Sequence, residues 1–456
     1  MYQTDTMRDS ASQRPFPDES PAIDFEKYHR AVERAESVRV IGKVIQVVGL
    51  ILEAQVQGVT IGDLCVIKTN RDTGETFAEV VGFKEGRVLL MPLGTTAGIS
   101  PGSEVLAAGH PLMVKVGREL LGRVLNGLGE PMDDKGPLGT KEERALDADP
   151  PDPVKRPRVT EVLRVGVRAI DGLLTIGRGQ RMGIFAGSGV GKSTLMGMIA
   201  RNAEADVNVI ALIGERGREV RDFIEESLGE EGLKKSVVIV ATSDQPPLIR
   251  LKASFVATAI AEYFRDQDKK VVFMMDSTTR FAYAQRDVGL ASGEPPTTRG
   301  YTPSVFAMLP KLMERSGTAE TGSITGFYTI LVEGDDFNEP IADQSRSILD
   351  GHIILSRSLA AKNHYPAIEV MNSVSRIMSN LVSDEHKEAA GKLREVLARY
   401  TEAEDLINIG AYVKGSNPKI DNAIAKIDAV NAFLRQGTFE QITFEDMLAQ
   451  LLEIFY

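Results

Sequence analysis

The feature that most constrains the fold of this chain is the stretch IFAGSGVGKSTLMGMI at residues 184–199. An apolar run leads into a glycine-rich loop, and Lys192 and Ser193 then open a second apolar run. The loop fits the phosphate-binding pattern G-x(4)-G-K-[ST], with Ala186 in the first position, where glycine is commoner. Glycine lets backbone N–H groups turn toward a phosphate, and a helix N-terminus adds positive charge. The stretch therefore predicts a strand, a phosphate loop and a helix in that order.

The residue types in this loop predict contacts with a bound nucleotide. Lys192 would neutralise the β- and γ-phosphates, and the Ser193 hydroxyl would bind Mg²⁺. The residues expected to form the nucleotide site are Gly187, Ser188, Gly189, Val190, Gly191, Lys192, Ser193 and Thr194. Loops of this kind occur in switches, kinases, pumps, helicases and motors. The loop alone therefore leaves open how the energy of the phosphate is used.

Carboxylates follow two other apolar runs. Asp276 ends VVFMMD, and we expect it to hold the Mg²⁺ shell if its strand neighbours the loop strand. Glu215 follows VNVIALI in the segment GERGREV and is a candidate for the base that orients water, with Arg216 facing the γ-phosphate. A solvated charge cluster at the start of a helix explains Glu215 and Arg216 equally well.

An arginine that reaches the phosphoryl oxygens accelerates hydrolysis by roughly 10³ to 10⁵. Arg376, in SVSRIMSN, is one candidate for this role. Arg346, Arg357 and Arg280 are others, and sequence spacing does not choose among the four.

Composition narrows the class of protein. A net charge of −11 argues against a large nucleic-acid footprint. With Cys65 as its single cysteine the chain cannot form an internal disulfide, which suits a reducing compartment. The N-terminus has no secretory pattern, and the apolar runs fall short of the ~18 residues that span a bilayer. We therefore expect a cytoplasmic protein that contacts membranes only through partners.

Pattern changes along the chain predict four regions. Residues 1–24 are polar and aperiodic, and we expect them to be disordered. Residues 25–105 begin with a short helix and continue as short strands with glycine turns, which indicates a β-barrel. In residues 106–378 strands alternate with helices, which predicts an α/β domain with a mostly parallel sheet. Residues 379–456 show helical patterns and predict a helical domain.

Several long blocks resemble the type III protein-export ATPases, with the flagellar branch closest. They are VGVRAIDGLLTIGRGQRMGIFAGSGVGKST, LIGERGREVRDFIEESL, MMDSTTRFAYAQRDVGL, GEPPTTRGYTPSVFAMLPKLMERSG and ILDGHIILSRSLAAKNHYPAIEVMNSVSRIMS, with GAYVKGSNPKID and FEDMLAQLLEIF near the end. That family is similar to the subunits of rotary F- and V-type ATPases. The resemblance implies a RecA-like P-loop domain between an N-terminal β-barrel and a C-terminal helical domain, assembled as a six-membered ring.

The resemblance also implies roles for individual residues. Glu215 in the GER motif would be the catalytic carboxylate, with Arg216 beside it. Arg376 in the S-x-S-R motif would be a finger inserted into the neighbouring subunit's site. Tyr365 in the HYPA motif would stack on adenine, and Arg280 would lie near the metal shell.

The function implied is that of a Mg²⁺-dependent ATPase, with ATP as substrate, that releases chaperones and prepares substrates for an export gate. The implied partners are further copies of the chain, a regulator or stator dimer, a central stalk protein, the gate and substrate–chaperone complexes. An injectisome secretion ATPase and a rotary ion-translocating subunit are the alternatives. A ring helicase is disfavoured because the chain is acidic and has no tryptophan. A non-catalytic subunit is disfavoured by the presence of Lys192, Glu215 and Asp276 together.

Overall fold

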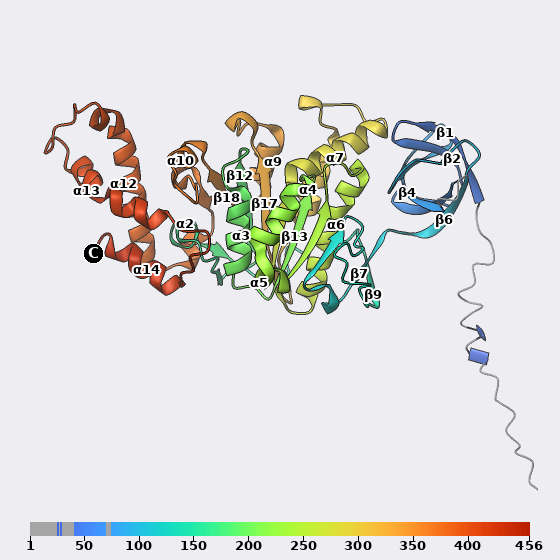
Figure 1. Cartoon of the computed structure of the whole chain (residues 1–456), viewed down its shortest axis with the longest axis horizontal. Helices are drawn as coiled ribbons and strands as arrows, with labels where there is room; N and C mark the ends of the chain where they lie inside the picture. The colour runs from blue at the N-terminus through green and yellow to red at the C-terminus, as the bar shows by residue number, and fades with distance from the viewer. Residues whose placement is uncertain (1–24, 27, 30–40, 70–73) are drawn as a thin grey trace, which may run out of the picture. The chain divides into compact units, whose positions relative to one another are not determined.

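The computed structural model describes residues 25, 26, 28, 29, 41–69 and 74–456 (Figure 1). The chain divides into two units, Met1–Val40 and Ile41–Tyr456. The segment 1–24, expected to be disordered, lies outside the described residues, as does most of the short helix expected from Phe25. All elements below belong to the second unit.

The first part of this unit is a closed barrel of antiparallel strands in the order β1-β2-β5-β4-β3-β6. Its strands are β1 (Ile41–Val48), β2 (Ile51–Gln55), β3 (Asp63–Lys68), β4 (Glu75–Lys84), β5 (Arg87–Pro92) and β6 (Glu104–Pro111). Side chains such as Val44, Leu52 and Leu90 fill the interior, and closure pairs the strand edges. The predicted β-barrel is confirmed, and β6 runs across the expected domain boundary at residue 105.

The central sheet carries the phosphate loop. Its strands follow the order β19-β18-β12-β17-β15-β13-β14-β8, and β16 pairs with β17. They are β8 (Arg123–Asn126), β12 (Arg181–Ala186), β13 (Val207–Ile213), β14 (Ser236–Ala241), β15 (Lys270–Asp276), β16 (Gly317–Thr318), β17 (Ser323–Leu331), β18 (Gly351–Leu355) and β19 (Val374–Ser375). From β18 to β8 all neighbours are parallel, whereas β19 is antiparallel to β18. The apolar runs of the inner strands are typical of a sheet covered on both faces.

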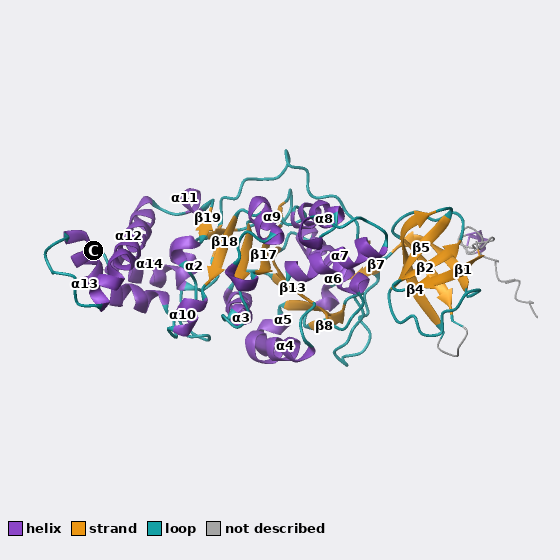
Figure 2. Cartoon of the chain, turned by 90° about the horizontal axis from the view of Figure 1, so that it is seen from above, coloured by secondary structure: helices purple, strands orange, loops and turns teal. Residues whose placement is uncertain are grey.

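Alternate side chains of the central strands enter two hydrophobic cores. Phe185 packs in the core that contains α6 (Pro247–Asp266) and α7 (Thr278–Ala291). Its neighbour Ile184 packs in the core that contains α3 (Lys192–Asn202) and residues of the C-terminal helices. Successive side chains of a strand point to opposite faces of the sheet, so both faces are apolar. Helices cover both faces (Figure 2). The predicted α/β nucleotide-binding domain is confirmed.

Shorter elements connect these layers. The short strands are β7 (Met113–Val116), β9 (Glu142–Ala145), β10 (Val162–Leu163) and β11 (Ile176–Gly177), and β7 pairs with β9 as β10 pairs with β11. The short α-helices are α2 (Arg168–Leu173), α4 (Gly217–Asp222), α5 (Gly229–Lys234), α8 (Pro303–Met313), α9 (Pro340–Ile348), α10 (Arg357–Ala361) and α11 (Met378–Leu381). Single 3₁₀ turns are η1 (Arg118–Leu120), η3 (Thr298–Gly300), η4 (Glu333–Asp335) and η5 (Val370–Asn372), and a π-helical segment, η2 (Phe223–Leu228), joins α4 to α5.

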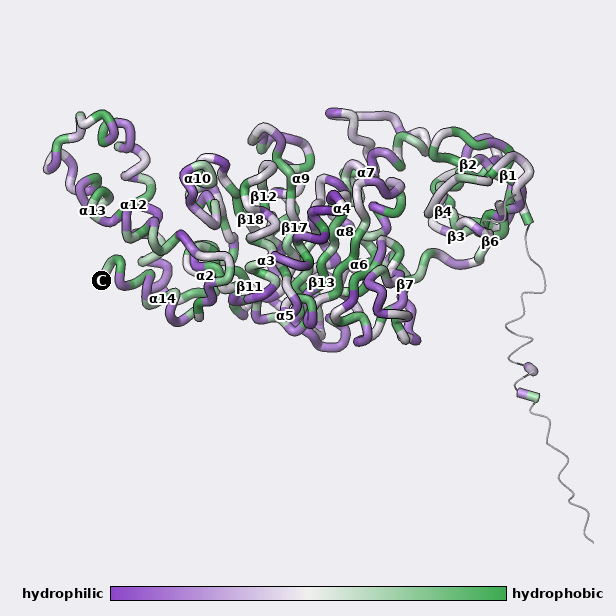
Figure 3. Tube along the Cα trace, viewed as in Figure 1, coloured by the Kyte–Doolittle hydropathy of each residue, from purple (hydrophilic) through white to green (hydrophobic). Residues whose placement is uncertain are grey.

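The C-terminal region consists of α12 (Asp384–Asn408), α13 (Pro418–Leu434) and α14 (Phe444–Glu453). The side chains of Ser383, Asn417 and Thr443 accept hydrogen bonds from backbone N–H groups at the three helix starts, which stabilises those ends. Hydrophobic and hydrophilic residues are interspersed along the helices (Figure 3), as in amphipathic helices that cover a core. The predicted helical domain is confirmed. In the described part of the chain no helix has the length and apolar character that crossing a membrane requires.

Candidate nucleotide site

The phosphate loop joins the C-terminal end of β12 to the N-terminus of α3. Gly189 and Gly191 adopt the left-handed backbone region, with φ of 78° and 90°, which glycine reaches without steric penalty. Gly191 is the N-cap of α3 and has no side chain with which to cap the helix. The first N–H groups of α3 therefore lack intrahelical partners and suit a phosphate group.

Lys192, the first residue of α3, lies between two carboxylates. Its Nζ atom is 2.5 Å from Asp276 Oδ1 and 3.4 Å from Glu215 Oε1. Burial favours the neutral amine, but the charges of Asp276 and Glu215 outweigh it and raise the pKa of Lys192 above its ordinary value. The lysine therefore remains protonated at neutral pH and can neutralise a phosphate.

Asp276 ends β15 and is buried, but its strand does not neighbour the loop strand. In the order β12-β17-β15, one strand separates the two. The condition set for Asp276, that its strand neighbours the loop strand, is therefore not met. Lys192 does not lie on β12 but at the start of α3, so the loop 187–191 and the lysine side chain together cover the offset of two strand spacings, each about 4.8 Å. Asp276 thus lies beside the phosphate loop through the reach of Lys192 rather than through strand adjacency.

Thr329 on β17 belongs to the site and was not identified from the sequence. Its Oγ1 atom donates a hydrogen bond of 2.7 Å to Asp276 Oδ1, and the residue is fully buried. This contact satisfies one lone pair of the carboxylate and fixes its orientation. The available signal was the single threonine in the otherwise apolar and aromatic run GFYTIL at residues 326–331.

Glu215 follows β13 and is also largely buried. Its side chain is 14% exposed. Burial and the charge of Asp276 raise the pKa of Glu215 to about 7, although Lys192 acts in the opposite direction. A carboxylate that titrates near neutral pH is matched to general-base chemistry. Of the two interpretations of Glu215 left open by its position, the buried geometry favours the catalytic one over the solvated cluster.

Arg216 is not brought to this cluster. Its side chain is 83% exposed, and Nη1 lies 3.3 Å from Oε1 of Glu219 on the same helix start. For Arg216 the structure therefore matches the interpretation as a solvated charge.

Of the other candidate arginines, Arg346 pairs with Asp343 on its own helix, and the remaining three fall into two groups. Arg280 and Arg357 lie against the site of their own chain, because a Cβ atom at Gly214 would lie 2.9 Å from Arg280 Cβ, and one at Gly187 would lie 2.6 Å from Arg357 Nε. Arg376 follows the edge strand β19 and is exposed. Its Nη2 atom donates to the carbonyl oxygen of Arg346, at 3.1 Å.

Tyr365 lies beside the phosphate loop. A Cβ atom at Gly191 would be 3.6 Å from Tyr365 Cε1. The tyrosine is 42% exposed, which leaves part of its ring free to contact a planar base. Its position is compatible with the expected contact to adenine.

The donor set is suited to Mg²⁺. Ser193 is exposed at the start of α3, and Asp276 contributes a buried carboxylate. Within the described residues no group of three or more His, Cys, Asp or Glu side chains could hold a metal. Mg²⁺ is commonly held by one or two carboxylates together with substrate phosphates, so one hydroxyl and one carboxylate fit that mode of binding.

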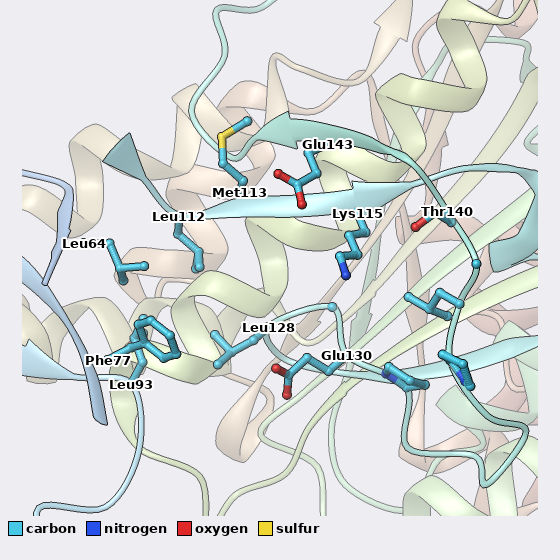
Figure 4. A pocket seen from close by; sticks show the side chains of 15 residues that line it. Leu64, Phe77, Leu93, Leu112, Met113, Lys115, Leu128, Glu130, Thr140 and Glu143 are labelled. Carbon is cyan, nitrogen blue, oxygen red and sulfur yellow. The ribbon is translucent and has the colours of Figure 1, made fainter. Parts of the chain in front are cut away.

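A cavity of about 480 Å³ lies apart from the phosphate loop. Leu64, Phe77 and Leu93 of the barrel line it opposite Leu112 and Leu128 (Figure 4). Lys115, Glu130 and Glu143 add polar groups to its lining. None of the residues of the nucleotide site is among its lining residues.

The fold and the site together define a P-loop ATPase with a RecA-like core. Over 430 residues the chain is 56% identical to the flagellum-specific ATP synthase of Bacillus subtilis, an alignment that covers 93% of this chain and 97% of that protein. It is 53% identical over 413 residues to the type 3 secretion system ATPase of Xanthomonas euvesicatoria, covering 91% and 93%. The chain belongs to the type III protein-export ATPases, and it is an ATP-hydrolysing enzyme of type III export.

Domain and structure comparisons agree with this assignment. The ATP synthase alpha/beta family models match at residues 44–109 for the beta-barrel domain and 166–375 for the nucleotide-binding domain. The T3SS EscN ATPase C-terminal domain matches at residues 382–453. The assembled ATPase EscN of the enteropathogenic E. coli type III secretion system superimposes with a TM-score of 0.86 at 48% identity, covering 91% of this chain and 99% of that chain. EscN in complex with its central stalk EscO gives a TM-score of 0.84 at 47% identity, with the same coverage.

Proposed function

We propose that this chain powers flagellar-type protein export by hydrolysing Mg²⁺–ATP in a site that a second copy completes. The observation that carries the proposal is the meeting of Lys192, Glu215 and Asp276 at one end of the central strands. The flagellum-specific name of the B. subtilis relative supports the flagellar branch. Hydrolysis releases chaperones from export substrates and prepares those substrates for the export gate.

Each side chain of the cluster has its own part in hydrolysis. Lys192 neutralises the β- and γ-phosphates, and Glu215 orients the attacking water and accepts its proton. Ser193 and Asp276 hold Mg²⁺, which when bound adds positive charge beside the phosphates. Arg216, which pairs with Glu219 in this structure, exchanges that contact for the γ-phosphate only when nucleotide binds.

The remaining loop residues and Tyr365 bind the nucleotide. The backbone from Gly187 to Gly191 surrounds the phosphates, and Thr194 continues the contact in the first turn of α3. Tyr365 stacks on the adenine base, and the stacking contact contributes to binding of ATP.

Arg376 is the residue by which one copy completes the site of another. It is exposed, and it donates to the carbonyl oxygen of Arg346 rather than to a carboxylate of its own cluster. An arginine supplied from a neighbouring copy stabilises charge on the transferring phosphoryl group and makes activity depend on assembly. The assembled relative EscN supports a ring, for which we propose six copies.

The other partners follow from the export function. The relative bound to the stalk EscO supports a central stalk protein as a partner. A regulator or stator dimer, the export gate and substrate–chaperone complexes complete the set. We place the ring in the cytoplasm, attached to the export apparatus at the inner membrane through these partners.

The test of the shared site mixes Glu215→Gln chains with Arg376→Ala chains, each nearly inactive alone. In a mixed ring an Arg376→Ala chain still has Glu215 and receives an arginine from a Glu215→Gln neighbour. Equal amounts should restore about a quarter of the sites. The control mixes Glu215→Gln with Lys192→Met, whose defects lie in the same site, and should restore none. Full activity of Arg376→Ala by itself overturns the shared site.

The injectisome secretion ATPase is the second candidate, because the Xanthomonas relative is nearly as similar. The immobilised chain is offered a flagellar chaperone–substrate complex, an injectisome chaperone–effector complex and the shaft subunit of a rotary ATPase. Retention of the flagellar complex, with release on addition of ATP, supports the proposal. Selective retention of either other ligand overturns the flagellar assignment.

A further inference from the structure

We infer that Gln436, in the C-terminal region, positions Tyr365 for the nucleotide base and so sets the affinity for ATP. The inference rests on the proposed contact between Tyr365 and adenine. Its observations concern residues 435–440, the first part of the connection between α13 and α14, which we name the connecting segment.

Gln436 joins this segment to the turn that carries Tyr365. The backbone N–H of Gln436 donates to the carbonyl oxygen of Tyr365 at 2.9 Å. Gln436 is 6% exposed. A hydrogen bond protected from water in this way holds the tyrosine backbone at a fixed place next to the phosphate loop.

The side chain of Gln436 is held on both its oxygen and its nitrogen. Oε1 accepts a hydrogen bond from the backbone N–H of Arg168 at 2.8 Å. Nε2 donates to the carbonyl oxygens of Gly166 at 2.8 Å and Glu440 at 3.0 Å. Both donors and one acceptor site of the amide are therefore used, so the residue has little freedom to shift.

Two arginines of the nucleotide domain hold the rest of the connecting segment. The guanidinium of Arg168 donates to the carbonyl oxygens of Phe433 and Arg435 and to the carboxylate of Glu440. Arg201, near the end of α3, donates to the carbonyl oxygen of Thr438 at 2.6 Å. The segment is thus attached both to α3, the helix that starts at the phosphate loop, and to the first residue of α2. Through its backbone N–H, Gln436 therefore holds the backbone of Tyr365 at a fixed place.

The matched variants are Gln436→Leu and Gln441→Leu. Leucine at 436 keeps about the size of the side chain but removes the hydrogen bonds to Gly166, Arg168 and Glu440. Gln441 has the same side chain, lies just beyond the connecting segment and is exposed. We expect Gln436→Leu to raise KM for ATP by about three- to tenfold with kcat within about twofold, and Gln441→Leu to change neither.

Two readouts separate positioning of Tyr365 from general damage. Inorganic tripolyphosphate has no base, so its inhibition constant as a competitor should be the same in Gln436→Leu and the unmodified protein. In a Tyr365→Ala background, Gln436→Leu should change KM by less than about twofold, because both substitutions act on one contact. Equal weakening of tripolyphosphate and ATP, or a full additive effect, overturns the inference.

The two proposals fail in distinguishable ways. An unchanged KM in Tyr365→Ala removes the base contact itself. A raised KM in Tyr365→Ala with an unchanged KM in Gln436→Leu removes only the positioning role. Gln436→Glu, which keeps the acceptor for Arg168 and loses the amide donors, is the second variant and should give an intermediate KM. If neither 436 variant folds, the residue serves folding and the inference is overturned.

Discussion

Lys192 Nζ lies 2.5 Å from Asp276 Oδ1 although β17 separates the strands that lead to these two residues. The loop that follows β12 places Lys192 beside this carboxylate, and Thr329 on β17 donates a hydrogen bond to the same carboxylate oxygen. The segment that follows β12, the strand β17 and the end of β15 therefore meet at one carboxylate oxygen, Asp276 Oδ1. The chemistry of the site depends on three strands that are far apart in sequence.

Replacing Asp276 by asparagine should lower kcat/KM for ATP by about 10² to 10³. The substitution removes the charge that faces Lys192 and the metal but keeps the shape of the side chain. Phosphate release measures the effect, and thermal unfolding checks that the fold survives. Asp384→Asn, at a fully exposed side chain, is the control and should behave as the unmodified protein does. Hydrolysis at the normal rate in Asp276→Asn would refute the metal role.

Activity should rise with pH through the titration of Glu215. Burial and Asp276 raise the pKa of this carboxyl to about 7, and the base must be ionised to accept a proton. A plot of kcat/KM against pH should therefore show an acid limb near pH 7. Glu215→Gln should lose the limb and about 10² to 10⁴ of the rate while still binding ATP. Glu225→Gln, at an exposed residue of η2, is the control and should keep both the rate and the acid limb. An acid limb that persists in Glu215→Gln contradicts the assignment of Glu215 as the base.

Specific activity should increase with protein concentration and then level off. If each site takes Arg376 from another copy, as proposed, dilution below the assembly range removes this arginine from every site. Phosphate release and sedimentation velocity, measured over the same dilution series, should change together. The Arg376→Ala chain should assemble equally well but show low, concentration-independent activity. A dilute monomer with full activity is incompatible with the shared site.

The free energy of unfolding should fall between about pH 4 and pH 7 through Asp171. Complete burial raises the pKa of this carboxyl to about 7, against the hydrogen bonds it accepts from the N–H groups of Val165 and Gly166. In this range the folded chain keeps a proton that the unfolded chain releases, so stability is lost as pH rises. The loss is roughly 1.4 kcal/mol per unit of pKa difference.

Urea unfolding at about pH 5 and pH 7.5 measures this effect. Asparagine at 171 has no proton to release, so Asp171→Asn should lose less stability than the unmodified chain over the same interval. Asp384→Asn should follow the unmodified chain. Parallel pH dependence of the Asp171 variant and the unmodified chain would show that this carboxyl titrates normally.

The sequence contained enough local information for the phosphate loop and for the strands that precede Lys192, Glu215 and Asp276. Apolar runs that end in glycine or a carboxylate are short-range signals, and the order strand–loop–helix follows from them. The separation of β12 from β15 was not predictable in this way, because parallel strands can be reached by crossovers that skip a position. For the same reason Thr329, which lies on the intervening strand, was missed.

Long-range polar contacts could not be predicted from the sequence either. Gln436 makes hydrogen bonds with backbone groups near residues 166–168, about 270 positions earlier. Nothing in the local pattern of a glutamine after a helix indicates such partners. Sequence spacing also could not show which arginine reaches the phosphates. The structure separates Arg280 and Arg357, which lie against the site of their own chain, from Arg376, which is exposed.

The attachment of the connecting segment has a consequence for protein engineering. A chimera that joined residues 1–378 of this chain to the helices of a relative would keep Arg168 and Tyr365 but import a foreign partner for both. The junction would then alter the hydrogen bonds that hold Tyr365, the proposed base-binding residue, even though it lies between domains in the linear sequence. Grafts of this kind should carry residues 435–440 as part of the host, so that only the helical hairpin before them is exchanged.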